Sequence, residues 1–144
     1  MESLGKLNSA IYRNSQSLIT SKLKDLDIMS GQCDFLYVIY LNEGISQKEL
    51  SNYLYIGKST TAKAIKYLLE KNYIYRQKDE LDSRLDKLFV SKEGEVIAKK
   101  IGNIFKENLK VASQGLSKSE QEQVLVLMHK VLKNYQKENE KYAK

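Results

Sequence analysis

The sequence of 144 residues contains no proline, one cysteine and one histidine. Because proline interrupts helices and is frequent in loops, its absence favours a chain that is mostly helical. The lone Cys33 excludes a disulfide within the chain, and Cys33 with His129 leaves too few ligands for a zinc site of Cys and His residues. We therefore expect no metal and no cofactor, and a protein that is not an enzyme.

Long apolar runs are also missing. The longest, residues 35–41 (FLYVIYL), is well short of the ~18 residues that a membrane-spanning helix needs. The first residues, MESLGK, lack the basic and then apolar pattern of a secretory signal. Apolar residues make up 42% of the chain and charged residues 29%, which is usual for a folded domain. We expect one folded domain, 1–144, in the cytoplasm.

The net charge of +6 is concentrated in the middle of the chain. Residues 1–42 carry as many Asp and Glu as Lys and Arg, whereas residues 57–78 carry six cations against the single acid Glu70. A basic segment of this kind is typical of a protein that binds a polyanion. A solvated helix face in a lysine-rich protein is the alternative.

Apolar residues at helical spacing predict two long arms, over residues 3–24 and 92–141, around a compact centre. The stripe of the first arm consists of Leu4, Leu7, Ile11 and Leu18. The second arm begins after Ser91, with a stripe of Ile97, Ile101, Ile104, Phe105, Leu109 and Ala112. A capping box at residues 117–120 then opens a last helix, whose stripe is Val124, Leu127, Met128, Val131 and Tyr135.

The centre, about residues 30–91, starts with three predicted helices. The first has Ser30 as its N-cap and ends before residues 42–44 (NEG). The second opens with a capping box at residues 46–49 (SQKE). After a turn at residues 55–57, the third runs from Lys58 to Lys71, with a buried stripe of Ala62, Ile65, Leu68 and Leu69. Two short helices joined by a tight glycine-containing turn are typical of a helix-turn-helix.

The start of the third helix suits the major groove of DNA. Its residues 58–61 (KSTT) are mostly small, so that its backbone can approach the bases, and its free amides carry a partial positive charge. At 100° per residue, Ser59, Lys63 and Lys66 share one face, opposite the apolar residues. Capping by Ser59 and Thr60 alone does not explain two basic residues on the exposed face.

A β-hairpin wing is predicted directly after these helices. Residues 73–77 and 88–90 are rich in β-forming residues, and the segment 78–84 between them is polar apart from one leucine. Two of the three arginines, Arg76 and Arg84, lie in or beside this hairpin. The planar guanidinium suits a narrow, electronegative minor groove, and Asp82 could hold Arg84 extended through an ion pair.

Four segments in this order resemble the winged helix-turn-helix of the MarR family of transcriptional regulators. They are residues 45–50 (ISQKEL), 57–63 (GKSTTAK), 79–84 (DELDSR) and 88–94 (LFVSKEG). The resemblance implies a mainly α fold with a small β-hairpin wing, flanked by N- and C-terminal dimerisation helices. It further implies a homodimer that binds double-stranded DNA at a pseudo-palindromic operator, as a repressor that a small effector or thiol oxidation releases.

The resemblance also assigns contacts. It implies that Lys58, Ser59, Thr60 and Lys63 enter the major groove, that Arg84, steadied by Asp82, enters the minor groove, and that Ser46 and Gln47 touch phosphates. With the basic pattern described above, the expected DNA-binding residues are Ser46, Gln47, Lys58, Ser59, Thr60, Thr61, Lys63, Lys66, Arg76, Asp82 and Arg84.

Two other functions remain open from the sequence. One is a helical protein–protein adaptor whose lysines only keep it soluble. The other is a regulator that senses oxidants through Cys33, although a buried cysteine that acts as a small hydrophobe is the favoured state. Tyr12, Tyr37 and Tyr40, near the junction of arm and centre, could line an effector cavity or fill a dimer interface.

Three catalytic or ligand-binding patterns are incomplete. A phosphate-binding loop at residues 57–59 needs a glycine at position 52, where the chain has Asn52, and a preceding strand. The acidic residues of 79–86 lack the glycine and the closing glutamate of an EF-hand. His129, the one histidine available to a Ser-His-Asp triad, lies beside an apolar helix stripe, where we expect a surface or hydrogen-bonded histidine.

Overall fold

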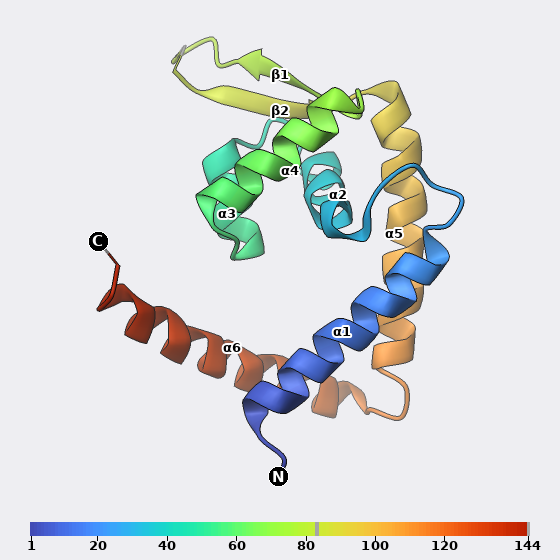
Figure 1. The fold of residues 1–144 in the computed structure, drawn as a ribbon, viewed down its shortest axis with the longest axis vertical. Coiled ribbons are helices and arrows are strands. Elements are labelled where there is room, and N and C mark those ends of the chain that lie inside the picture. The colour runs from blue at the N-terminus through green and yellow to red at the C-terminus, as the bar shows by residue number, and fades with distance from the viewer. Residues whose placement is uncertain (83, 144) are drawn as a thin grey trace. The chain divides into compact units, whose positions relative to one another are not determined.

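A computed structural model describes residues 1–82 and 84–143 of the chain. It is mainly α-helical with one small antiparallel hairpin, which confirms the predicted fold class (Figure 1). In chain order the elements are α1 (Leu4–Lys22), the short 3-10 helix η1 (Ser30–Gln32), α2 (Cys33–Leu41), α3 (Gln47–Leu54), α4 (Lys58–Glu70), β1 (Ile74–Lys78), β2 (Asp86–Val90), α5 (Lys92–Ala112) and α6 (Lys118–Glu140).

The chain divides into two compact units. The first, Met1–Asn108, contains the elements from α1 to β2 and most of α5. The second begins at Leu109 and consists of the last turn of α5 and helix α6. None of the described helices is long and apolar enough to cross a lipid bilayer.

Both predicted capping boxes are present. Ser46 Oγ accepts a hydrogen bond from the backbone N–H of Glu49 at 3.1 Å, and Glu49 Oε1 accepts one from the N–H of Ser46 at 3.2 Å. Ser117 and Glu120 make the same two bonds at 3.1 and 2.8 Å. Each box satisfies two amide groups that the first helical turn leaves without an intrahelical partner, and so determines where α3 and α6 begin.

The prediction that Ser30 caps the second helix is wrong. Ser30 is the first residue of η1, and α2 begins only at Cys33, after Gln32, without a side-chain cap. A side-chain cap requires an N-cap residue with an extended backbone. Gln32, at the N-cap position of α2, already has helical backbone angles because η1 leads directly into the helix, and it makes no such bond. The helix ends at Leu41, and Gly44 follows with a φ of +92°, a conformation that favours glycine.

The core of the first unit lies where α2, α3, α4, β2 and α5 meet. Its fully buried aliphatic side chains are Leu36, Ile39, Leu50, Ile65, Leu68, Leu88 and Ile101. Most of the apolar run 35–41 is therefore core helix, which explains why it has no polar face.

The hairpin is joined to the helix-turn-helix by backbone hydrogen bonds. In the two-stranded sheet Ile74 pairs with Val90 and Arg76 with Leu88. Leu88 also forms a bridge with Ile45, the residue before the α3 capping box: its N–H donates to Ile45 O at 2.9 Å, and its carbonyl accepts from Gly44 N at 2.8 Å. The base of the wing is thereby held against the start of α3.

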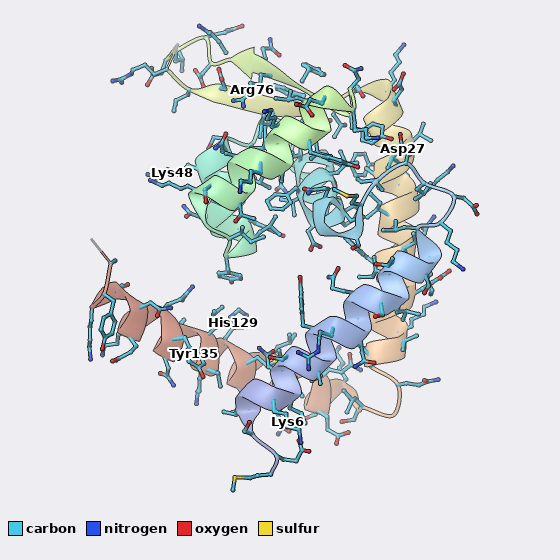
Figure 2. The ribbon with its side chains drawn as sticks, in the orientation of Figure 1. Lys6, Asp27, Lys48, Arg76, His129 and Tyr135 are labelled. Atoms are coloured by element: carbon cyan, nitrogen blue, oxygen red, sulfur yellow. The ribbon has the colours of Figure 1, made fainter. Side chains whose placement is uncertain are left out.

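Side-chain contacts attach α1 to the rest of the first unit. Lys22 Nζ lies 2.8 Å from Glu107 Oε2, and Asn108 Nδ2 donates to Ser15 Oγ at 3.1 Å, so α1 and α5 are joined at two points. After α1, the segment around Asp27 is bonded to the end of α4. Lys71 Nζ is 2.9 Å from Asp27 Oδ1, and the hydroxyl of Tyr73 donates to Asp27 O at 2.7 Å (Figure 2).

Gly94, near the start of α5, lies against the backbone of Tyr73, the residue before β1. A Cβ at this position would overlap the carbonyl oxygen of Tyr73, which accepts a hydrogen bond from Ser91 N and cannot move freely. We expect Gly94→Ala to lower the free energy of unfolding by about 3 kcal/mol in urea titrations. Gly5→Ala is the control, because Gly5 lies in α1 with nothing near its Cβ position. This substitution should leave the free energy of unfolding unchanged or raise it by up to ~1 kcal/mol. Equal effects of the two substitutions would contradict this packing.

Candidate nucleic-acid interface

Helix α4 is rotated about its axis relative to the prediction. Its buried residues are Thr61, Ala64, Ile65 and Leu68. Ala62, predicted to be buried, is exposed, and Leu69 is only half-buried. The outward side carries Lys58, Ser59, Thr60, Ala62, Lys63 and Lys66. The face of Ser59, Lys63 and Lys66 is thus exposed as predicted, and Ala62 lies beside it.

Thr61 must be removed from the expected DNA contacts, because the structure places it in the core with no exposed surface. Its hydroxyl donates to the carbonyl of Gly57 at 3.0 Å and accepts from the buried hydroxyl of Ser51 on α3 at 2.7 Å. Both hydroxyls are therefore paired, as buried polar groups must be. A threonine among small and basic residues gives no sequence signal for this partner ten positions earlier.

The start of α4 is open to solvent. Its N-cap is Gly57, which has no side chain to bond the first amides of the helix, and residues 57–60 are exposed. The amides and the positive end of the helix dipole therefore lie beside the side chains of Lys58 and Ser59.

The candidate residues at the start of α3 are less exposed than those at the start of α4. Ser46 and Gln47 are half-buried, and the oxygen of the Ser46 hydroxyl accepts the capping bond from Glu49 N. Lys48, the next residue, is exposed on α3 (Figure 2). Sequence reasoning missed Lys48, although its position directly after Gln47 at the helix start was a usable signal.

Arg76 forms an ion pair within the wing. It is exposed on β1, and its Nη1 lies 3.2 Å from Asp86 Oδ2 on β2 (Figure 2). It pairs across the sheet with buried Leu88, so it belongs to the sheet face that turns toward the core. The guanidinium is therefore less available to an external partner than that of Arg84.

The wing tip is organised by two aspartates. Asp79 Oδ1 accepts hydrogen bonds from the N–H of Leu81 at 2.7 Å and of Asp82 at 3.2 Å, and Asp79 Oδ2 lies 3.4 Å from Lys87 Nζ. These bonds, the one from Leu81 first, lower the pKa of the Asp79 carboxyl. Asp79 thus joins the backbone of the hairpin loop, at Leu81 and Asp82, to Lys87 of β2.

Asp82 holds Arg84 with both carboxylate oxygens, as predicted. Oδ1 accepts from Arg84 Nε at 3.0 Å and from its backbone N–H at 3.0 Å, and Oδ2 accepts from Nη2 at 3.1 Å. The Arg84 hydrogen bond lowers the pKa of the Asp82 carboxyl, so the carboxylate stays ionised through neutral pH. The Arg84 side chain is still 87% exposed, and its guanidinium is presented in one orientation. Ser83, also part of the wing motif, lies outside the described residues.

Helix α4 and the wing belong to the same compact unit, Met1–Asn108. β1 follows α4 after a short turn and contacts it, and the hairpin then runs back past the helix. In Figure 1 the wing tip and the N-terminal end of α4 both lie toward the left of this part of the molecule. The start of α4 and the tip of the wing thus lie on the same side of this unit in that view.

Cys33 is a core residue at the start of α2, with 1% of its surface exposed. Burial, with a smaller contribution from Asp34, raises the pKa of its thiol to about 12. Because the thiolate is the reactive form of cysteine, this environment opposes oxidation near neutral pH. In the part of the chain that the structure describes, no three His, Cys, Asp or Glu side chains gather to hold a metal ion.

Two of the three tyrosines near the arm, Tyr37 and Tyr40, lie close together. Tyr37 packs edge-on against Phe105 at a ring distance of 5.4 Å and lies 6.3 Å from Tyr40. Tyr12 is exposed on α1. A surface hollow of about 480 Å³ at the junction of arm and centre is lined instead by Thr20, Leu23, Lys24, Ile28, Met29 and Ser30. An effector cavity lined by tyrosines therefore stays a prediction.

Comparison with known proteins agrees with this geometry. A model of the MarR family matches residues 24–85. The HTH-type transcriptional regulator YybA of Bacillus subtilis is 31% identical over 128 residues, which cover 89% of this chain and 85% of that protein. The chain belongs to the MarR family. Its members are winged-helix transcriptional regulators, so this chain is one of them.

Solved structures of the MarR family extend the match to nearly the whole chain. The crystal structure of the transcriptional regulator SlyA has a TM-score of 0.88 and 26% identity, and covers 99% of this chain and 100% of that one. A MarR-family structure from Listeria monocytogenes complexed with 26mer DNA has a TM-score of 0.84 and 25% identity, and covers 93% of this chain and 89% of that one. The flanking helices as well as the winged centre are thus similar to those of the family.

The environment of Cys33 predicts an inert thiol. We expect iodoacetamide at pH 8 to label the native protein at least ~100-fold more slowly than the urea-unfolded chain, because the native thiol is both buried and protonated. Mass spectrometry of timed samples measures both rates. Peroxide should likewise change DNA affinity no more in the wild type than in Cys33→Ala. Rapid native labelling, or a peroxide effect that Cys33→Ala abolishes, would restore the redox hypothesis.

Proposed function

We propose that this MarR-family chain is a homodimeric repressor that binds a pseudo-palindromic operator and is released by a small effector. The observation that carries the DNA-binding part is that one compact unit contains both helix α4, with its exposed lysine face, and the hairpin that bears the exposed Asp82–Arg84 pair. The start of the helix and the tip of the hairpin lie on the same side of the ribbon in Figure 1. The related Listeria monocytogenes structure complexed with 26mer DNA supports the same use of the fold.

Helix α4 has the properties of a major-groove reader. The groove is about 12 Å wide and admits one helix. The exposed residues at its start, Ser59 and Thr60, are short, so the helix can approach the base edges end-on. Lys63 and Lys66, one and two turns further on, are exposed on the same face and can meet guanine edges or phosphates.

Arg84 has the properties of a minor-groove contact. Its guanidinium is fixed by two hydrogen bonds to Asp82 and is nonetheless exposed. A side chain that is held in one orientation before binding loses less conformational entropy in the complex. Narrow minor grooves have an enhanced negative potential that attracts such a cation. Ser46, Gln47 and Arg76 complete the proposal as contacts to the phosphate backbone.

The flanking helices supply the proposed dimer interface. On α1, Leu4, Leu7 and Ile11 are all exposed, and no residue of α6 is buried. The exposed residues of the predicted α6 stripe are Val124, Leu127, Met128 and Tyr135. Apolar stripes of this length are rarely left in water, because each buried Å² of apolar surface contributes ~25 cal/mol. A two-fold dimer of winged modules then requires an operator with two inverted half-sites.

In this proposal residues 1–144 form one MarR-like domain, with a DNA-binding centre at about 30–91 and dimerisation arms at about 3–24 and 92–141. Repression follows if the operator overlaps a promoter, because the bound dimer then excludes RNA polymerase. An effector that binds the free form in preference to the DNA-bound form would release it. Selection of bound fragments from a random duplex pool, with and without candidate effectors, tests these steps.

A protein–protein adaptor is the other function that the sequence left open. Salt dependence separates the two. DNA binding through several lysines and arginines should weaken steeply as salt rises, because each neutralised phosphate releases counterions. An adaptor should show no specific duplex binding and no such slope.

The Asp82–Arg84 pair gives the sharpest test of the wing. We expect Arg84→Ala to weaken operator binding roughly tenfold or more in fluorescence-polarisation titrations. Asp82→Asn should also weaken it, although this change makes the protein more positive, because the guanidinium loses its fixed orientation. Arg13→Ala, which removes an exposed arginine of α1, is the matched control and should leave affinity unchanged. Tighter binding by Asp82→Asn would show that charge alone, and not orientation, matters at this position.

The dimer interface is tested by two neighbouring residues of α6 with similar exposure, Leu127 at 58% and Val126 at 56%. At 100° per residue Leu127 lies in the apolar stripe, whereas Val126 points to the opposite, polar side. We expect Leu127→Glu to shift the protein to monomer in sedimentation experiments at micromolar concentration, and Val126→Glu to leave the dimer intact. A monomeric wild type, or loss of the dimer in both variants, would refute this assignment.

A further inference from the structure

Ala62 is an apolar residue on the exposed side of helix α4. It is exposed in the second turn of α4, three residues after Ser59 and four before Lys66, and it lies beside both on the helix surface. On the other side of the Ser59–Lys63 line lies Thr60. The outward surface of the helix start therefore consists of one line of polar and basic side chains with a methyl group on each flank.

The orientation of this surface is fixed from inside. Thr61, directly before Ala62, is bonded through its hydroxyl to Gly57 O and Ser51 Oγ and has no exposed surface. Rotation of α4 about its axis would break the bond between Thr61 and Ser51 on α3, leave the buried Ser51 hydroxyl unpaired and pull Ala64, Ile65 and Leu68 out of the core. Ala62 therefore stays on the solvent side, next to the face that carries Lys63.

The chemistry that this surface can use for base recognition is narrow. Between positions 58 and 66 the helix contains no Arg, Asn, Gln, Asp or Glu. It therefore lacks the amides that pair bidentately with adenine and the carboxylates that accept from cytosine. What remains is the ammonium groups of Lys58, Lys63 and Lys66 for guanine, the hydroxyls of Ser59 and Thr60 for any base, and apolar contact with the 5-methyl group of thymine.

We propose that Ala62 is a sequence-reading residue that packs its methyl group against the 5-methyl group of a thymine in each half-site of the operator. This inference rests on the proposed DNA-binding function and names the base that the helix selects. Alanine suits this contact because it is the smallest side chain with a methyl group, and it lets the helix backbone come close to the base edge. Guanine, cytosine and adenine offer no methyl at that point of the groove.

The test uses deoxyuridine, which differs from thymidine only by the missing 5-methyl group. A duplex selected by the wild-type protein from a random pool is made again with each thymidine of one half-site replaced in turn by deoxyuridine. Affinity is measured by fluorescence polarisation at constant salt. Loss of one methyl contact should weaken wild-type binding about fourfold at one position, which corresponds to the ~0.8 kcal/mol of one buried CH₂ group.

Two variants assign the methyl contact to a residue. Ala62→Gly should bind the thymidine and deoxyuridine duplexes equally at that position, since no methyl remains on the protein. Any weakening of the helix by glycine affects both duplexes alike and cancels in their ratio. Thr60→Ser, which removes a methyl group from the opposite flank and keeps the hydroxyl, should retain the fourfold ratio.

If Ala62→Gly does not fold, Ala62→Ser replaces it, because its hydroxyl meets the thymine methyl with a polar atom and should reduce the ratio toward one. The proposal is overturned if no thymidine position is sensitive, if Ala62→Gly and Ala62→Ser keep the full ratio, or if Thr60→Ser abolishes it. In those outcomes specific, salt-dependent binding of the selected duplex still supports the proposed function. Failure to select any duplex would refute both.

Discussion

The packing of Thr61, Ala64, Ile65 and Leu68 against the rest of the core determines which side of helix α4 faces solvent. The Thr61 hydroxyl is held between Gly57 O and Ser51 Oγ, so that helices α3 and α4 are joined by a polar contact inside an otherwise apolar core. A polar pair of this kind contributes little net stability, but it is costly to break, and it therefore specifies one arrangement over its neighbours. Together with the burial of Ala64, Ile65 and Leu68, it leaves Ser59, Ala62, Lys63 and Lys66 on the solvent side.

The wing depends on a second set of polar contacts, at its base and at its tip. At the base, the bridge between Ile45 and Leu88 fixes the hairpin against the start of α3. At the tip, Asp79 bonds the backbone of the loop and Asp82 bonds Arg84. The guanidinium is therefore positioned by a chain of contacts that runs from the core to the end of the hairpin. A flexible loop with the same charge would lose more entropy on binding.

The arms differ from the centre in how they are stabilised. The winged centre has its own buried core, whereas α6 buries none of its residues within the chain. Burial within the chain therefore contributes little to the stability of α6. In the proposed dimer, the same contacts that complete α6 also set the distance between two winged modules, so folding of the arm and selection of operator spacing are coupled.

Features that arise within a few residues could be predicted from the sequence. The capping boxes at Ser46 and Ser117 are i, i+3 contacts, the hairpin follows from β-forming residues around a polar tip, and Asp82 reaches Arg84 two positions away. The family motifs likewise lie in contiguous segments. Three features depend on packing between distant segments and emerge only from the folded chain: Ser30 caps no helix, Thr61 is buried and Ala62 is exposed. The rotation of a short helix about its axis depends on partners elsewhere in the chain, here Ser51, and periodicity within the helix does not contain that information.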